Sequence, residues 1–155
     1  MATHQQNSTQ LDISTVSNAN GMRFALVVSE WNAQITENLF EGAKDVLTSK
    51  GANSVDRIDV PGSYELVYGC RRQFDKGYDA IIAIGSVIRG ETQHFDYVCQ
   101  AVSQGIKDLN LLGQTPVIFC VLTDDTLQQA TDRSGGALGN KGAEAAVAAI
   151  KMARL

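Results

Sequence analysis

Four short runs of apolar and β-branched residues alternate along this chain with segments whose apolar side chains recur at helical spacing. The runs lie at 23–29 (RFALVVS), 55–60, 79–88 (DAIIAIGSVI) and 116–122 (PVIFCVL). Strands separated by single helices imply right-handed crossovers, which give a parallel sheet whose two faces are covered by helices. The alternation therefore predicts one α/β domain, a three-layer sandwich with a four-stranded parallel sheet flanked by helices.

The segments between the strands predict helices of different lengths. Apolar residues from Ile35 to Leu47 recur at helical spacing, and Gly51 ends that helix. A helix to about Phe74 follows the second strand, and a long amphipathic helix at 95–109 follows the third. The fourth strand is followed by a short helix at 126–133, a glycine-rich turn (SGGALGNKG) and a final helix at 142–153.

Length and composition limit the domain organisation and the class of partner. The chain has 155 residues, enough for one domain, and its polar start predicts a flexible tail at 1–20 before a single domain at 21–155. The net charge of -4 and the lack of a basic run argue against nucleic acid, because phosphates require a lysine or arginine patch. No apolar run approaches the roughly 18 residues that span a bilayer. We therefore expect neither nucleic acid nor a membrane as a partner.

The three cysteines, Cys70, Cys99 and Cys120, are far apart and embedded in apolar stretches. Their spacing matches no metal-ligand pattern, so no metal site is predicted. Small buried thiols in a reducing compartment explain them most simply, and we expect a cytoplasmic protein.

Unusual polar and aromatic residues follow the predicted strands, at 30–32, 61–65, 89–94 and 123–125. In a parallel sheet, ligands bind beyond the carboxyl ends of the strands, where loops lead into helices. The four loops are therefore expected to meet at one edge, which is the predicted functional site. His94 lies in one of these loops, and His4 is the only other histidine in the chain.

The Gly90-Glu91-Thr92 turn and His94 open the long helix, and each has two interpretations. The turn can present free N–H groups and the positive helix end to a phosphate, or Thr92 can simply cap the helix. The helix dipole discourages protonation of a histidine at this end, so a neutral His94 would be a capable proton acceptor near pH 7. The alternative is a surface or core histidine without a catalytic role.

Other residues of this edge also leave two interpretations open. Trp31 directly follows a strand, and it either stacks on a planar ring or plugs the domain edge. Glu65 either binds a ligand or complements a helix dipole, and solvated surface positions are the simplest explanation of Arg133 and Lys141. The residues alone predict a site for a small anionic ligand that can contain a ring, with one acid–base residue.

Four motifs in a fixed order extend this interpretation: DVPGSYEL at 59–66, IGSVIRGETQHFDYV at 84–98, PVIFCVLT at 116–123 and GNKG at 139–142. Through them, residues 22–155 resemble the 6,7-dimethyl-8-ribityllumazine synthase family. The resemblance implies the lumazine synthase fold, with flavodoxin-like topology, and a transferase of riboflavin biosynthesis that uses no metal or organic cofactor. The implied reaction condenses 5-amino-6-ribitylamino-2,4-pyrimidinedione with 3,4-dihydroxy-2-butanone 4-phosphate and yields the lumazine, phosphate and water.

The resemblance also implies roles for individual residues. His94 would shuttle protons, Arg133 would pair with the phosphate, and Trp31 would stack on the pyrimidinedione in place of the usual Phe. Lys141 would reach a ring carbonyl. The phosphate would also contact Gly90, Glu91 and Thr92, and the remaining substrate contacts would come from Asn32, Gly62, Ser63, Tyr64, Glu65, Val87, Ile88 and Phe119.

In the family that the chain resembles, each site lies between neighbouring subunits of a pentamer, so Phe119, Arg133 and Lys141 would come from the adjacent chain. Family members occur as pentamers, paired pentamers or 60-subunit shells. The turn before GNKG has no insertion that would bend the next helix away, which favours the shell.

Three other functions are compatible with this scaffold. One is a non-catalytic flavin or lumazine carrier, and another is a shell that mainly encloses a partner such as riboflavin synthase. A flavodoxin-like electron carrier is the third, but its phosphate loop should follow the first strand, where this chain has EWN at 30–32.

Overall fold

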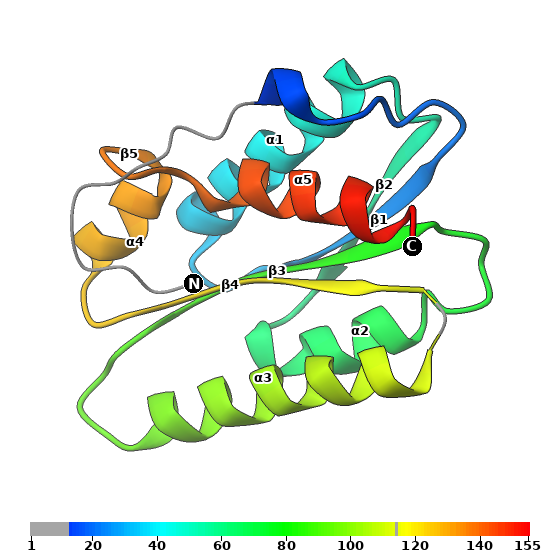
Figure 1. The fold of residues 1–155 in the computed structure, drawn as a ribbon. Helices are drawn as coiled ribbons and strands as arrows, with labels where there is room; N and C mark the ends of the chain where they lie inside the picture. Colours follow the sequence, from blue (N-terminus) through cyan, green and yellow to red (C-terminus); the bar gives the residue numbers. More distant parts are fainter. Residues whose placement is uncertain (1–12, 114) are drawn as a thin grey trace.

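The computed structural model describes residues 13–113 and 115–155, and a four-stranded sheet lies at its centre (Figure 1). Every neighbouring pair of strands is parallel, and Ile88 lies in register with Asp124 on the next strand. The predicted four-stranded parallel sheet is confirmed. In the order β2-β1-β3-β4, its strands are β1 (Arg23–Ser29), β2 (Ser54–Val60), β3 (Ala80–Ile88) and β4 (Val117–Asp124).

Helices cover both faces of the sheet (Figure 1). Successive strand side chains point to opposite faces, so along β3 the buried Ile82 packs with α1 and α5, whereas the buried Ile81 packs with α2 and α3. The sheet is therefore the middle of three layers, as the sequence predicts. The four helices are α1 (Ala33–Ser49), α5 (Lys141–Met152), α2 (Leu66–Arg71) and α3 (His94–Leu112).

The connection from β4 to α5 contains more structure than the predicted helix and turn. After α4 (Leu127–Arg133), the glycine-rich segment forms an antiparallel hairpin of β5 (Ser134–Gly136) and β6 (Gly139–Asn140). Asn140 then caps α5, because its Oδ1 accepts from the N–H of Gly142 at 2.8 Å. This cap starts the final helix at Lys141.

The helical segment after β2 is shorter than the sequence predicts. It starts as a 3₁₀ turn, η2 (Ser63–Glu65), and α2 ends at Arg71 instead of continuing to about Phe74. Asp75 and Gly77 follow with positive φ angles of 65° and 77°, which an α-helix cannot contain. This tight reversal returns the chain to β3.

Part of the segment predicted as a flexible tail is packed against the domain. Val16 and Ala19 are buried, and η1 (Ile13–Thr15) precedes them. The N–H of Ala19 donates to the Lys50 carbonyl oxygen at 2.7 Å, and Lys50 Nζ donates to the Val16 carbonyl oxygen at 2.9 Å. The packed part of the described chain therefore begins before residue 21, whereas residues 1–12 of the predicted tail lie outside the described residues.

Two of the three cysteines match the expectation of buried thiols. Cys70 and Cys120 are buried, and burial raises the pKa of each thiol to about 12. Cys99 is only partly buried, so the expectation is wrong for this residue. In the part of the chain that the structure describes, no helix is long and apolar enough to cross a membrane, and no group of three His, Cys, Asp or Glu side chains is placed to hold a metal ion.

Helices α1 and α5 approach each other through their backbones at Gly142. A Cβ atom there would lie 1.9 Å from the Leu39 carbonyl oxygen, and both helices are packed into the core, so little movement can relieve the clash. We expect Gly142→Ala to lower the free energy of unfolding by about 1–3 kcal/mol in urea denaturation. Ala148→Ser, at a half-buried position of the same helix, is the matched control and should change it by less than about 0.5 kcal/mol. An unchanged stability of Gly142→Ala would contradict the close approach.

Candidate active site

Asn32 joins the loop after β1 to the main chain of β3. Its backbone is left-handed, with φ of 57°, a conformation that Asn tolerates better than most residues. Its Nδ2 donates to the Ser86 carbonyl oxygen at 2.8 Å instead of capping α1. The structure therefore places Asn32 beside the segment that contains Val87 and Ile88, as expected for residues of one site.

Trp31 and Glu65 both border Gly62. A Cβ atom on Gly62 would lie 2.9 Å from Glu65 Oε2 and 3.7 Å from Trp31 Cδ1, so any larger residue would fill the space between them. Trp31 is 72% exposed, and thus it does not plug the domain edge. Tyr64 is also exposed, at 61%. The loops after β1 and β2 therefore present two aromatic rings and one carboxylate on the same edge.

Buried polar atoms without a hydrogen bond concentrate at this edge. Ser63 Oγ is one of them, and it lies against the backbone of β3, since a Cβ on Gly85 would be 2.7 Å from it. Buried polar groups normally have partners, so several unpaired ones near the strand ends are typical of a functional site. Among the described residues the unpaired atoms are Ser29 Oγ, Ser63 Oγ, Ser86 Oγ and Asp124 Oδ2.

The loop after β3 exposes the Gly90-Glu91-Thr92 turn and places His94 at the first position of α3. Thr92 Oγ1 accepts from the His94 N–H at 3.4 Å, so Thr92 does take part in starting the helix. A Cβ on Gly90 would have no atom within 4 Å, which leaves this side of the turn open. His94 is exposed, and therefore it is not a core histidine.

Arg133 is held at the end of β4 by a buried carboxylate. Its Nη1 lies 3.5 Å from Asp124 Oδ1 and donates to the Gln129 carbonyl oxygen at 3.1 Å. The Asp124 side chain is only 8% exposed, and burial raises its pKa although Arg133 acts in the opposite direction. Because Asp124 is in register with Ile88, this pair lies beside the carboxyl end of β3.

Lys141 and Phe119 lie apart from the other predicted residues. Lys141 Nζ is 2.8 Å from both Glu144 carboxylate oxygens at the start of α5. Phe119 is 44% exposed in the middle of β4, an edge strand, in register with Ala83. No ion pair or hydrogen bond between described residues joins Lys141 to the loop that carries His94. The single chain thus gathers the predicted residues of the first three loops, but not these two.

The sequence predictions assigned no role to Arg89, Asp124 and Asp125, which the structure places between the loops after β3 and β4. Arg89 Nε donates to Asp125 Oδ1 at 2.7 Å, and the Arg89 N–H donates to the Asp124 carbonyl oxygen at 3.0 Å. The sequence does contain a signal for these contacts: two consecutive aspartates follow an apolar strand, where a buried carboxylate requires a partner.

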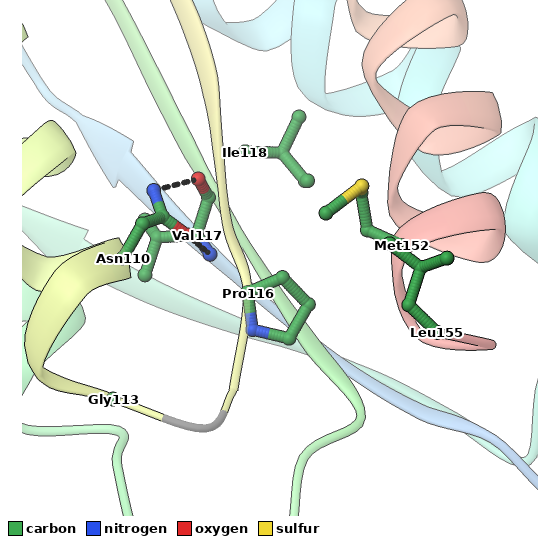
Figure 2. Close-up of a pocket in the computed structure, with 7 residues that line it drawn as sticks. All are labelled: Asn110, Gly113, Pro116, Val117, Ile118, Met152 and Leu155. Atoms are coloured by element: carbon green, nitrogen blue, oxygen red, sulfur yellow. Dashed lines mark hydrogen bonds between the residues drawn. The ribbon is translucent and has the colours of Figure 1, made fainter.

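Two hollows on the described part of the chain are lined by no predicted site residue. One, of about 410 Å³, lies between the ends of α3 and α5 (Figure 2), where the side chain of Asn110 is hydrogen-bonded to the backbone of Val117. The other, of about 390 Å³, lies between α1 and the β5–β6 hairpin. Trp31, Tyr64 and His94 are exposed, so the candidate site of a single chain lies open at its surface.

Comparisons with known proteins agree with the resemblance that the four sequence motifs indicate. The sequence model of the 6,7-dimethyl-8-ribityllumazine synthase family matches residues 21–155. A protein of that name from Christiangramia forsetii is 55% identical, covering 100% of this chain and 95% of its own. Proteins of the same name from Flavobacterium psychrophilum and Parabacteroides distasonis are 53% and 50% identical, covering 100% and 98% of this chain and 84% and 97% of their own. The chain therefore belongs to the 6,7-dimethyl-8-ribityllumazine synthase family.

Proposed function

We propose that the carboxyl edge of the sheet is the active site at which this chain makes 6,7-dimethyl-8-ribityllumazine. The substrates are 5-amino-6-ribitylamino-2,4-pyrimidinedione and 3,4-dihydroxy-2-butanone 4-phosphate, and the product is an intermediate of riboflavin biosynthesis. The observation that carries the proposal, in a member of this family, is that Asn32 hydrogen-bonds to the end of β3, which leads into the His94 loop, while Trp31 and Glu65 both border Gly62.

The loops after β1 and β2 would bind the pyrimidinedione. Trp31 offers an exposed indole face for stacking, worth roughly 0.5–1.5 kcal/mol beyond its buried area. Asn32 and Glu65 supply polar groups near it, and Ser63 adds a buried hydroxyl without a partner among the described residues. Val87 and Ile88 would contribute main-chain groups, since they directly follow Ser86, whose carbonyl oxygen accepts a hydrogen bond from Asn32.

The loop after β3 and Arg133 would bind the phosphate. The Gly90-Glu91-Thr92 turn is exposed and leads into α3, whose positive end favours an anion. Arg133 supplies a planar guanidinium, which suits phosphate oxygens. Its pairing with Asp124 supports the proposal, because an arginine with a fixed orientation loses less freedom when it binds.

The chemistry would proceed through a Schiff base between the amine of one substrate and the ketone of the other. His94 would then accept and return protons while phosphate is eliminated, before the second amine closes the ring. Its exposed position at the start of α3, next to the phosphate turn, supports this role. Holding both reactants in register would supply the larger part of the acceleration, up to roughly 7–11 kcal/mol for well-oriented reactants.

The site would be completed by a neighbouring subunit of a pentamer, which would supply Phe119, Arg133 and Lys141. Exposed large apolar side chains are available to be buried at such an interface. We extend the proposal to a 60-subunit shell that can enclose riboflavin synthase, and to a cytoplasmic location, which free thiols support. The exposed side chains include Trp31, Phe119, Leu127 and Leu138.

An assay of the purified protein with both substrates tests the activity, with lumazine formation followed against an enzyme-free control. Product formation above the control supports the enzyme. If the protein binds lumazine but does not accelerate its formation, the carrier or the enclosing shell becomes the better function.

Mixed assemblies test whether two chains share one site. Subunits with His94→Ala and subunits with Arg133→Ala, each nearly inactive at ketone phosphate concentrations well below the raised KM, would be unfolded together, refolded at equal amounts and assayed at such a concentration. If His94 and Arg133 of one site come from different chains, about a quarter of the sites in random mixed rings regain both residues and activity returns. If one chain supplies both, no site is repaired and the mixture stays inactive. Refolded unmodified protein is the control for recovery.

A further inference from the structure

Arg89, an arginine without a role in the proposed chemistry, borders the turn at 90–93. Its Nε donates to Asp125 Oδ1 at 2.7 Å, and its Nη1 lies 3.4 Å from Asp96 Oδ1. Its guanidinium carbon lies 4.2 Å from the centre of the Phe95 ring. The Arg89 side chain therefore spans the whole turn, from the residue before it to the first turn of α3.

The backbone of Arg89 is anchored as well. Its N–H donates to the Asp124 carbonyl oxygen at 3.0 Å, and Asp125 comes directly after. The end of β4 thus holds Arg89 through two consecutive residues, once by backbone and once by side chain. Since a Cβ on Gly90 would have no atom within 4 Å, packing around Gly90 does little to fix the turn. The contacts of Arg89 fix the turn relative to β4 and α3.

The charges around Arg89 argue against direct phosphate binding by this side chain. Its Nε and Nη1 are already engaged by Asp125 and Asp96, and the negative charge of these two carboxylates opposes a further anion at the guanidinium. We infer that Arg89 is a positioning residue: held by Asp125 and Asp96, it fixes the Gly90-Glu91-Thr92 turn for the ketone phosphate. The inference rests on the proposed phosphate role of that turn.

The Asp125→Asn variant distinguishes a positioning role of Arg89 from a purely electrostatic effect of the Asp125 charge, because the two predict opposite changes in phosphate affinity. Removing a negative charge beside the turn would, by charge alone, tighten phosphate binding. Losing the charge-assisted bond to Arg89 would instead loosen the turn. We expect the KM for the ketone phosphate and the inhibition constant of inorganic phosphate to rise about three- to tenfold. The KM for the pyrimidinedione should change less than about twofold.

A second variant and a matched control complete the experiment. Arg89→Gln should raise the same two constants, and the double variant with Asp125→Asn should add little, because both changes break one interaction. Asp108→Asn removes an exposed carboxylate that pairs with Lys107 toward the other end of α3, and it should leave both constants unchanged. A lower KM in Asp125→Asn, or an equal rise in Asp108→Asn, would overturn the positioning role. If inorganic phosphate does not compete with the ketone phosphate in the unmodified enzyme, the proposed phosphate site fails instead.

Discussion

Replacing His94 with alanine is expected to lower kcat by about 10²- to 10⁴-fold, the usual contribution of a general acid–base residue. The affinity for the pyrimidinedione should change less than about twofold, because the groups proposed to hold that substrate lie on the loops after β1 and β2. His94 is exposed at the start of α3 and its removal leaves no core cavity, so the fold should be unaffected. The loss would therefore report chemistry and not unfolding.

Steady-state kinetics and titration of the pyrimidinedione measure the two effects separately. Gln100→Ala, an exposed substitution on the same helix, is the control for any general disturbance of α3. If His94→Ala weakens substrate binding as much as it slows turnover, His94 positions the substrate and the proton-transfer role is wrong.

Replacing Arg133 with alanine is expected to raise the KM for the ketone phosphate by about 10- to 100-fold, since hydrogen bonds between a guanidinium and a phosphate are charge-assisted and bidentate. The KM for the pyrimidinedione should stay nearly constant. Arg133→Lys keeps the charge but loses the planar guanidinium, so its KM for the ketone phosphate should lie between those of the unmodified enzyme and Arg133→Ala. A change in the pyrimidinedione constant alone would show that Arg133 faces the other substrate.

Arg133→Ala should also change how stability depends on pH, because it leaves the buried Asp124 carboxylate without its cation. Burial raises the pKa of Asp124 and Arg133 lowers it, so the substitution should raise that pKa further. A carboxyl group whose pKa is raised in the folded state favours folding at low pH, and this contribution is lost as the pH rises through the folded-state pKa. The Tm deficit of Arg133→Ala should therefore be larger at neutral pH than near pH 4. Adding Asp124→Asn should recover the stability without recovering the KM.

The layers of the fold followed from local patterns in the sequence. Consecutive buried residues such as Ile81 and Ile82 mark a strand covered on both faces, and single helices between the strands imply that the strands are parallel. The contacts of Ala19 with Lys50 could not be predicted, because a polar composition does not reveal an alanine that packs against a distant part of the chain. The hairpin after α4 was missed for a similar reason, since glycine-rich segments carry no periodicity.

The candidate site was predictable as an edge but not as a set of contacts. Loops after parallel strands must gather, so a common edge for Trp31, Glu65 and His94 followed from topology. Which carboxylate holds which arginine depends on register: Asp124 lies opposite Ile88, and only the folded chain brings Arg133 to it. The exposure of Trp31 likewise depends on packing that no local pattern contains.

The end of β4 engages an arginine through each of two consecutive aspartates. Asp124 pairs with Arg133, and Asp125 pairs with Arg89. In the proposed ring, Arg133 serves the neighbouring subunit whereas Arg89 serves its own. The Asp124-Asp125 dipeptide would then be under selection from two active sites at once, so these two positions should tolerate fewer substitutions than an ordinary surface turn. A substitution of Asp124 would then disturb the neighbouring subunit's site, whereas a substitution of Asp125 would disturb the site of its own chain.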